Sequence, residues 1–133
     1  MGPPQSEGHG GHLVLVIDDE QMVRETLADF LADEGHRALL AADGDEALKL
    51  LATTTPRPSL IILDLKMPNL DGWGFRRRQA EDPALASIPV IVVTAAQGAG
   101  AGAAAVLRKP LRLAQLAAAM NSILSAPPET RQT

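Results

Sequence analysis

The 133-residue sequence contains no cysteine and no tyrosine, and its aromatic residues are limited to one tryptophan and two phenylalanines. Without cysteine, the chain can form neither a disulfide nor a thiolate metal site. Since 46% of the residues are hydrophobic but only 2% are aromatic, the core must be mainly aliphatic. That apolar content is sufficient for one sizeable domain.

An excess of positive charge and long hydrophobic runs are also missing. The formal net charge is −4, which argues against a surface that follows nucleic-acid phosphates. No apolar run approaches the roughly 20 residues of a membrane span, and no charged segment followed by an apolar one begins the chain as in a secretory signal. We therefore expect a cytoplasmic domain with no direct nucleic-acid binding and no membrane insertion.

Five short apolar runs are present, and each predicts a strand. Runs of this length, bounded by turn residues, are typical of strands that are buried on both faces. Helical patterns separate most of them, which indicates an α/β fold with a parallel sheet and helices on both faces. The predicted strands are 13–17, 38–42, 59–63, 89–94 and 105–107.

The helical segments carry recognisable start and stop signals. The first ends at Gly35, a residue suited to the left-handed position after a helix. The second begins at Asp43, and Glu46 three residues later completes a capping-box pattern. The third covers 73–81, with arginines 76–78 on its solvent side, and is stopped by the following Asp-Pro pair.

Glycine and alanine alternate between the fourth and fifth strands, over 97–104. Each glycine costs about 1 kcal/mol relative to alanine inside a helix, and a parallel crossover usually needs about a dozen residues. We therefore expect a loop or a single turn there rather than a full helix. A last helix is predicted over 113–124.

The two ends of the chain are predicted to be disordered tails around one domain, 13–125. Residues 1–12 and 126–133 are rich in glycine, proline and polar residues, a composition that cannot bury enough apolar surface to fold. His9 and His12 are interpreted as solvated tail residues rather than metal ligands.

Polar side chains follow four of the predicted strands where each strand ends. Asp18 and Asp19 follow the first, Asp64 ends the third, Thr94 ends the fourth and Lys109 follows the fifth. Each alone could be a helix start, a strand end or a surface charge. Because the carboxyl ends of parallel strands share one edge, where sites of open α/β sheets are built, we expect them to converge.

Three carboxylates at one edge repel each other unless a cation neutralises them. Hard oxygen ligands without cysteine or histidine favour Mg²⁺. Asp64 could then act as a carboxylate nucleophile toward phosphorus. The metal and the ammonium group of Lys109 would neutralise charge on the transferred group, and the Thr94 hydroxyl would donate to a phosphoryl oxygen.

Four motifs, in this order and spacing, resemble the receiver domain of response regulators in two-component signalling. The resemblance covers about 13–124 and implies a flavodoxin-like, doubly wound sheet of five parallel strands in the order 2-1-3-4-5, with the fourth helix here shortened or missing. The motifs are Asp-Asp-Glu at 18–20, Asp-Leu-Lys-Met-Pro-Asn-Leu-Asp-Gly at 64–72, Val-Val-Thr-Ala at 92–95 and Leu-Arg-Lys-Pro at 107–110.

This resemblance also implies roles for the site residues. Asp64 would accept a phosphoryl group from the phosphohistidine of a histidine kinase or histidine phosphotransfer protein. Mg²⁺ would be held by the carboxylates of Asp19 and Asp64 and by the backbone carbonyl of Lys66, with Asp18 contributing partly through water. The chain would catalyse its own phosphorylation and dephosphorylation at most, and would signal to a downstream protein that the sequence does not name.

The phosphoryl group itself would be bound by Thr94 and Lys109, and the Lys109–Pro110 peptide bond would be cis. Two features depart from the family pattern. Val106 occupies a position where the family usually carries tyrosine or phenylalanine as a rotamer switch coupled to the threonine, and the Gly/Ala segment replaces the fourth helix. Both departures concern the readout surface rather than the phosphorylation site.

Three other interpretations are open at this point. An aspartyl-nucleophile phosphohydrolase needs an Asp-x-Asp motif after the first strand, which 18–20 does not match. A flavodoxin-like cofactor module needs a Ser/Thr/Gly phosphate loop there. A receiver-shaped interaction module that no longer switches by the usual mechanism is supported by Val106 and by the Gly/Ala segment.

Overall fold

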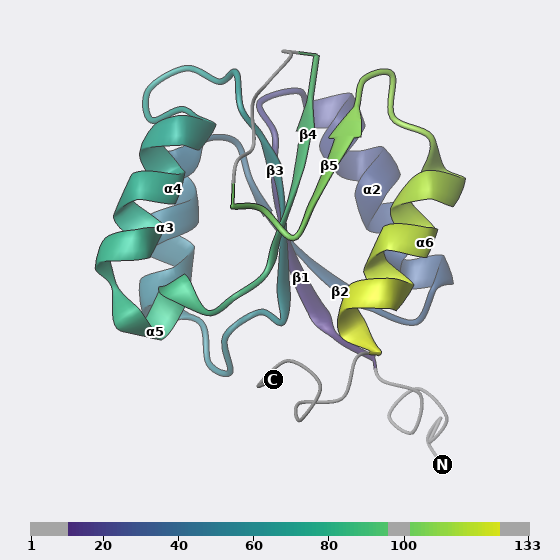
Figure 1. Ribbon diagram of the computed structural model, residues 1–133, viewed down its shortest axis with the longest axis horizontal. Coiled ribbons are helices and arrows are strands. Elements are labelled where there is room, and N and C mark those ends of the chain that lie inside the picture. Colours follow the sequence, from purple (N-terminus) through teal and green to yellow (C-terminus); the bar gives the residue numbers. More distant parts are fainter. Residues whose placement is uncertain (1–10, 96–101, 126–133) are drawn as a thin grey trace.

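The computed structural model describes residues 11–95 and 102–125. Five strands form one parallel sheet in the order β2-β1-β3-β4-β5, which confirms the predicted doubly wound topology (Figure 1). The strands are β1 (Leu13–Ile17), β2 (Arg37–Ala41), β3 (Leu60–Asp64), β4 (Val90–Thr94) and β5 (Ala105–Arg108).

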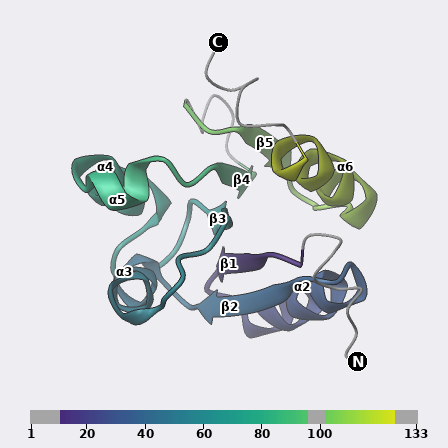
Figure 2. The same cartoon turned by 90° about the horizontal axis from the view of Figure 1, so that it is seen from below.

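Helices cover both faces of the sheet, as Figures 1 and 2 show. One face carries α2 (Gln21–Asp33) and α6 (Leu113–Leu124). The other carries α3 (Gly44–Thr53), α4 (Gly72–Glu81) and the short α5 (Pro83–Ala86). No helix in the described part of the chain is long and apolar enough to cross a membrane.

Alternate residues of the central strands fill two aliphatic cores, one under each helical layer. In β3, Leu60 and Ile62 pack with the core that includes residues of α2 and α6, while Ile61 and Leu63 pack with the core that includes residues of α3 and α4. All residues of β3 and β4 are buried, as their uninterrupted apolar sequences predict. The layers therefore hold the ends of these strands rigidly.

Two of the residues predicted to end or begin a helix have the conformation or the hydrogen bond expected of a helix cap. Gly35 follows α2 with a positive φ of 87°. At the start of α3, Oδ1 of Asp43 accepts a hydrogen bond from the Glu46 N–H (2.8 Å). The Glu46 carboxylate accepts in return from the N–H of Ala42 (2.6 Å), one residue before the expected partner.

Two details of the third helical segment differ from the prediction. Arg77 and Arg78 are exposed, but Arg76 is half-buried, because its guanidinium lies close to Gly102, ahead of β5. The Asp-Pro pair also starts a helix, α5. Asp82 caps this helix by accepting from the N–H of Ala84 (2.9 Å), and proline is favoured at a first helical position.

The connection between β4 and β5 is not helical at Ala95 or over 102–104. The greater part of the loop predicted over 97–104 lies outside the described residues, as do residues 1–10 and 126–133 of the predicted tails.

The assignment of His12 to a solvated tail is wrong, because this residue is half-buried at the start of the sheet. Its N–H donates to Nδ1 of His36 (3.1 Å), its Nδ1 lies 3.1 Å from Oγ of Ser59, and its carbonyl accepts from the N–H of Arg37 (2.8 Å). The chain is thus attached to β2 and β3 one residue before β1 begins.

The hydrogen bond from His12 to His36 predicts a pH dependence of folding. The pKa of His36 lies below its ordinary 6.5, first because of burial and second because of His12, with Glu34 acting in the opposite direction. The unfolded chain therefore binds this proton more readily, so the contribution to stability is complete above about pH 6.5 and is lost as pH falls toward the lowered pKa.

We expect urea denaturation to show that the advantage of the native protein over His36→Asn shrinks between pH 7.5 and pH 5.5. Asparagine offers an acceptor oxygen but does not titrate. Comparing the two proteins cancels the titration of groups that do not interact with His36. A stability difference that is independent of pH would show that His36 titrates alike in the folded and unfolded states.

Candidate functional site

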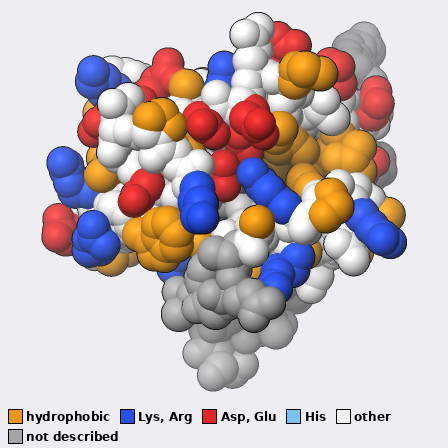
Figure 3. Space-filling model, turned by 90° about the horizontal axis from the view of Figure 1, so that it is seen from above, with side chains coloured by type: hydrophobic (Ala, Val, Ile, Leu, Met, Phe, Trp, Pro, Cys, Tyr) orange, Lys and Arg blue, Asp and Glu red, His pale blue; other side chains and the backbone are white. Residues whose placement is uncertain are grey.

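The predicted site residues lie together at the carboxyl edge of the sheet. Asp64 and Thr94 are the last residues of β3 and β4, while Asp18 and Lys109 come directly after β1 and β5. Acidic side chains gather in the middle of this face, as Figure 3 shows, and hydrophobic side chains flank them. The parallel topology thus brings together residues that are far apart in the sequence.

Three carboxylates form a compact cluster. One carboxylate oxygen from each of Asp18, Asp19 and Asp64 lies within 4.8 Å of those of the other two. Asp18 and Asp64 are buried, at 4% and 5% exposure, while Asp19 is exposed. The cluster therefore has a buried floor and one wall open to solvent.

Backbone contacts fix the position of Asp18. Its Oδ1 accepts from the N–H of Glu20 (2.9 Å), and its N–H donates to the carbonyl of Ala41 at the end of β2 (3.1 Å). The carbonyl of Asp18 accepts from Nη1 of Arg24 (2.7 Å). Arg24 was not among the predicted site residues, because nothing in its helical spacing shows that it reaches back across the start of α2.

Asp64 is paired with the nearby lysine. Nζ of Lys109 lies 3.3 Å from Oδ2 of Asp64 and 3.9 Å from Oδ2 of Asp18. On its other side, Oδ1 of Asp64 accepts a long hydrogen bond from the N–H of Lys66 (3.4 Å). The Lys109–Pro110 peptide bond is cis, as the family resemblance implies.

Gly72 supports Asp64 by allowing close backbone packing. A Cβ at this position would lie 2.6 Å from the carbonyl oxygen of Asp64 and 2.6 Å from Cα of Leu65. The N–H of Gly72 donates to the carbonyl of Leu65 (2.9 Å), and Asp71 caps α4 by accepting from Gly74 (2.9 Å). Any larger residue at 72 would displace the end of β3, so the Asp-Gly pair fixes the loop that follows Asp64.

Thr94 is 1% exposed, and its carbonyl accepts from the N–H of Lys109 (3.1 Å). This bond connects the ends of β4 and β5 and sets the backbone from which the lysine side chain reaches Asp64. Val106 on β5 is 41% exposed. A short, exposed side chain at this position cannot change rotamer together with the buried threonine in the way that an aromatic ring could.

Burial raises the pKa of both Asp18 and Asp64 above the ordinary range. For Asp64, Lys109 opposes this effect without cancelling it. For Asp18, the hydrogen bond from Glu20 opposes it, while the charge of Asp64 adds to it. A hard divalent cation would relieve this cost, and the all-oxygen donor set fits Mg²⁺.

We expect Asp64→Asn to raise the free energy of unfolding by about 1 kcal/mol in EDTA at neutral pH, the usual size of a stabilising change. A raised carboxylate pKa means that ionisation opposes folding above that pKa, so a neutral isostere removes this cost. The matched control is Asp29→Asn, which changes an exposed aspartate of α2. Chemical denaturation of the three proteins is the measurement, and a variant less stable than the native protein would contradict the assignment of the cost to Asp64.

Known proteins share this architecture. The family model for the response regulator receiver domain matches residues 14–121. Response regulator MprA of Mycolicibacterium vanbaalenii is 39% identical over 120 residues, covering 84% of this chain and 49% of that protein. MprA of Mycobacterium ulcerans is 38% identical, with the same coverage. The chain thus spans about half the length of the curated relatives it matches.

Solved structures of receiver domains have the same fold as this chain. The receiver domain of a signal transduction histidine kinase from Syntrophus aciditrophicus is 30% identical, with a TM-score of 0.79 and coverage of 86% of this chain and 91% of that one. The receiver domain of sensor histidine kinase PA1611 from Pseudomonas aeruginosa, solved with a magnesium ion coordinated in its active site cleft, is 26% identical, with a TM-score of 0.79 and coverage of 88% and 100%. The chain belongs to the response regulator receiver domain family of two-component systems.

Proposed function

We propose that this receiver domain accepts a phosphoryl group on Asp64 from the phosphohistidine of a histidine kinase or histidine phosphotransfer protein, with Mg²⁺ as cofactor. The observation that carries the proposal is the position of Asp64. It is a buried carboxylate within the acidic cluster, 3.3 Å from the ammonium group of Lys109. A nucleophile toward phosphorus needs this combination of a fixed carboxylate and neighbouring positive charge.

The transfer exchanges one bond to phosphorus for another. A carboxylate oxygen of Asp64 forms the new O–P bond as the N–P bond of the phosphohistidine breaks. The electron pair of the N–P bond stays on the ring nitrogen, and the imidazole leaves as the neutral ring with a proton taken from water. Burial and backbone packing hold the nucleophile in one orientation, which lowers the entropic part of the barrier. No further protein side chain needs to act as a base, because the attacking carboxylate is already ionised.

The other site residues would bind the metal and the phosphoryl oxygens. We assign Asp18, Asp19, Asp64 and the backbone carbonyl of Lys66 to Mg²⁺, which when bound would neutralise charge on the transferred group. Lys109 is already directed at Asp64 and would keep an anionic partner after transfer, since the phosphoryl group replaces the carboxylate charge. The hydroxyl of Thr94 would donate to a phosphoryl oxygen.

An apolar groove beside the acidic cluster supports docking of the phosphodonor protein. It has a volume of about 510 Å³ and runs between the start of α2 and the segment after β5. Met22, at 79% exposure, and Leu113, at 37%, stand at its sides, and Lys109 borders both the groove and the cluster. A protein seated there would bring its histidine next to Asp64.

The chain would act in the cytoplasm and pass its signal to a downstream protein, without binding nucleic acid or inserting into a membrane. Its catalysis would be confined to its own phosphorylation and dephosphorylation.

Incubation with acetyl phosphate and Mg²⁺ should add one phosphoryl group to the native protein and none to Asp64→Asn, as measured by intact mass. The modification should disappear in hydroxylamine, which cleaves acyl phosphates, and EDTA should prevent its formation. The Asp29→Asn control should be modified like the native protein.

Stable modification of Asp64→Asn would place the phosphoacceptor elsewhere. A folded native protein that is modified neither by acetyl phosphate nor by phosphohistidine donors would favour the alternative that Val106 supports, an interaction module that no longer switches.

A further inference from the structure

The loop of residues 65–71 connects the end of β3 with α4 and begins directly after Asp64. Its base is closed by a hydrogen bond from the N–H of Gly72 to the carbonyl of Leu65 (2.9 Å). Most side chains in the middle of the loop are exposed, so burial in the core does not fix them. Contacts with other segments must therefore determine where the carbonyl of Lys66, which we assign above to Mg²⁺, is placed.

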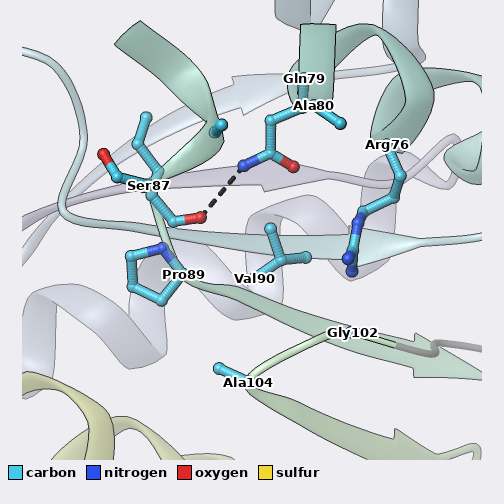
Figure 4. Close-up of a pocket in the computed structure, with 10 residues that line it drawn as sticks. Arg76, Gln79, Ala80, Ser87, Pro89, Val90, Gly102 and Ala104 are labelled. Atoms are coloured by element: carbon cyan, nitrogen blue, oxygen red, sulfur yellow. Dashed lines mark hydrogen bonds between the residues drawn. The ribbon is translucent and has the colours of Figure 1, made fainter. Parts of the chain in front are cut away.

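The helix that follows this loop is anchored at its far end. Gln79, near the end of α4, is 4% exposed, and its Nε2 donates to the carbonyls of Leu85 (2.9 Å) and Ile88 (3.0 Å) (Figure 4). These bonds hold α4 to the segment that leads into β4. The loop thus connects two fixed elements, and only its middle part remains to be positioned.

The start of α3 holds this middle part. Asn69 has a positive φ of 60°, a conformation that asparagine adopts more readily than most residues with a Cβ. Its Nδ2 donates to Oδ2 of Asp43 (2.7 Å), which lies 26 residues earlier. Beside this contact, the N–H of Gly44 donates to the carbonyl of Leu70 (2.8 Å). The loop is therefore attached to α3 at two adjacent residues.

Asp43 uses both carboxylate oxygens at once. Oδ1 accepts from the N–H of Glu46 and caps α3 (2.8 Å), while Oδ2 accepts from Asn69. The bond from Glu46 and, after it, the bond from Asn69 hold the pKa of Asp43 below its ordinary 3.8, so the side chain is ionised and acts only as an acceptor at neutral pH. A side chain with a single acceptor oxygen could cap the helix but could not also hold the loop.

We propose that Asp43 is a positioning residue for the metal site, which acts through Asn69 on the loop that carries the carbonyl of Lys66. The N–H of Lys66 also donates to Oδ1 of Asp64 (3.4 Å), so a displaced loop would change both this contact and the assigned metal ligand. Asp43 is not one of the three carboxylates of the acidic cluster. The inference rests on the function proposed above, because it requires Mg²⁺ at that cluster.

Mg²⁺ titrations of the full chain, followed through the fluorescence of Trp73, test the inference with two variants. Asp43→Ser keeps a good helix cap but removes the second oxygen, and Asn69→Gly keeps the left-handed conformation but removes the amide. We expect each to bind Mg²⁺ about fivefold more weakly, somewhat less than the usual effect of removing a group that contacts a metal ligand directly. The double variant should bind no more weakly than either one, because both lose the same hydrogen bond.

The matched control is Asp82→Ser, which makes the same substitution at the aspartate that caps α5 and should leave the affinity unchanged. In EDTA, the amide signals of Lys66 and Met67 in ¹H–¹⁵N NMR spectra should shift in Asp43→Ser and in Asn69→Gly but not in the control. This comparison does not require the metal, and Asn69→Gly leaves the cap of α3 intact.

Unchanged Mg²⁺ affinity in both Asp43→Ser and Asn69→Gly would overturn the inference alone, provided that Asp64→Asn still weakens binding. An equal loss in Asp82→Ser, or additive losses in the double variant, would also overturn it, because the effect would then not come from the shared hydrogen bond. A native protein that does not respond to Mg²⁺ would overturn the inference together with the metal site of the proposed function.

Discussion

Two carboxylates buried at one edge of the sheet repel each other, and the surrounding structure has to offset that repulsion. Asp18 and Asp64 are nearly inaccessible to solvent, both have raised pKa values, and Lys109 offsets their charge in part. Such a site opposes folding, so the scaffold must hold it in place by other interactions. In the function proposed above, a divalent cation would offset this negative charge, and the cation would in turn offset the charge of a transferred phosphoryl group.

The scaffold meets this requirement with two aliphatic cores and close backbone packing. The buried strands β3 and β4 lie between helical layers on both faces, so their last residues, Asp64 and Thr94, have little freedom to separate. Gly72 then brings α4 directly against the backbone of Asp64, and the bond from Lys109 to the Thr94 carbonyl positions the lysine. Within residues 11–95 and 102–125, the charged groups of the site are thus held in place mainly by the apolar packing around them.

The features that the sequence predicted correctly depend on local or periodic patterns of residues. Uninterrupted apolar runs predicted the strands, the periodic last helix was predicted at its observed bounds, and polar residues at strand ends predicted which side chains would meet. What was missed depends on contacts between distant segments: His12 with His36 and Ser59, and Arg76 with Gly102 ahead of β5. The four-residue α5 is too short to show a helical period, although its Asp-Pro start was visible.

A Mg²⁺ titration followed through the fluorescence of Trp73 shows whether the buried carboxylates hold the cation. This is the chain's one tryptophan, it is 39% exposed, and it follows the glycine that packs on Asp64. We expect a saturable change in the native protein and in Asp29→Asn, with at least tenfold weaker binding in Asp64→Asn. A titration that is unchanged by Asp64→Asn would contradict it, because the buried carboxylates would then not be what holds the cation.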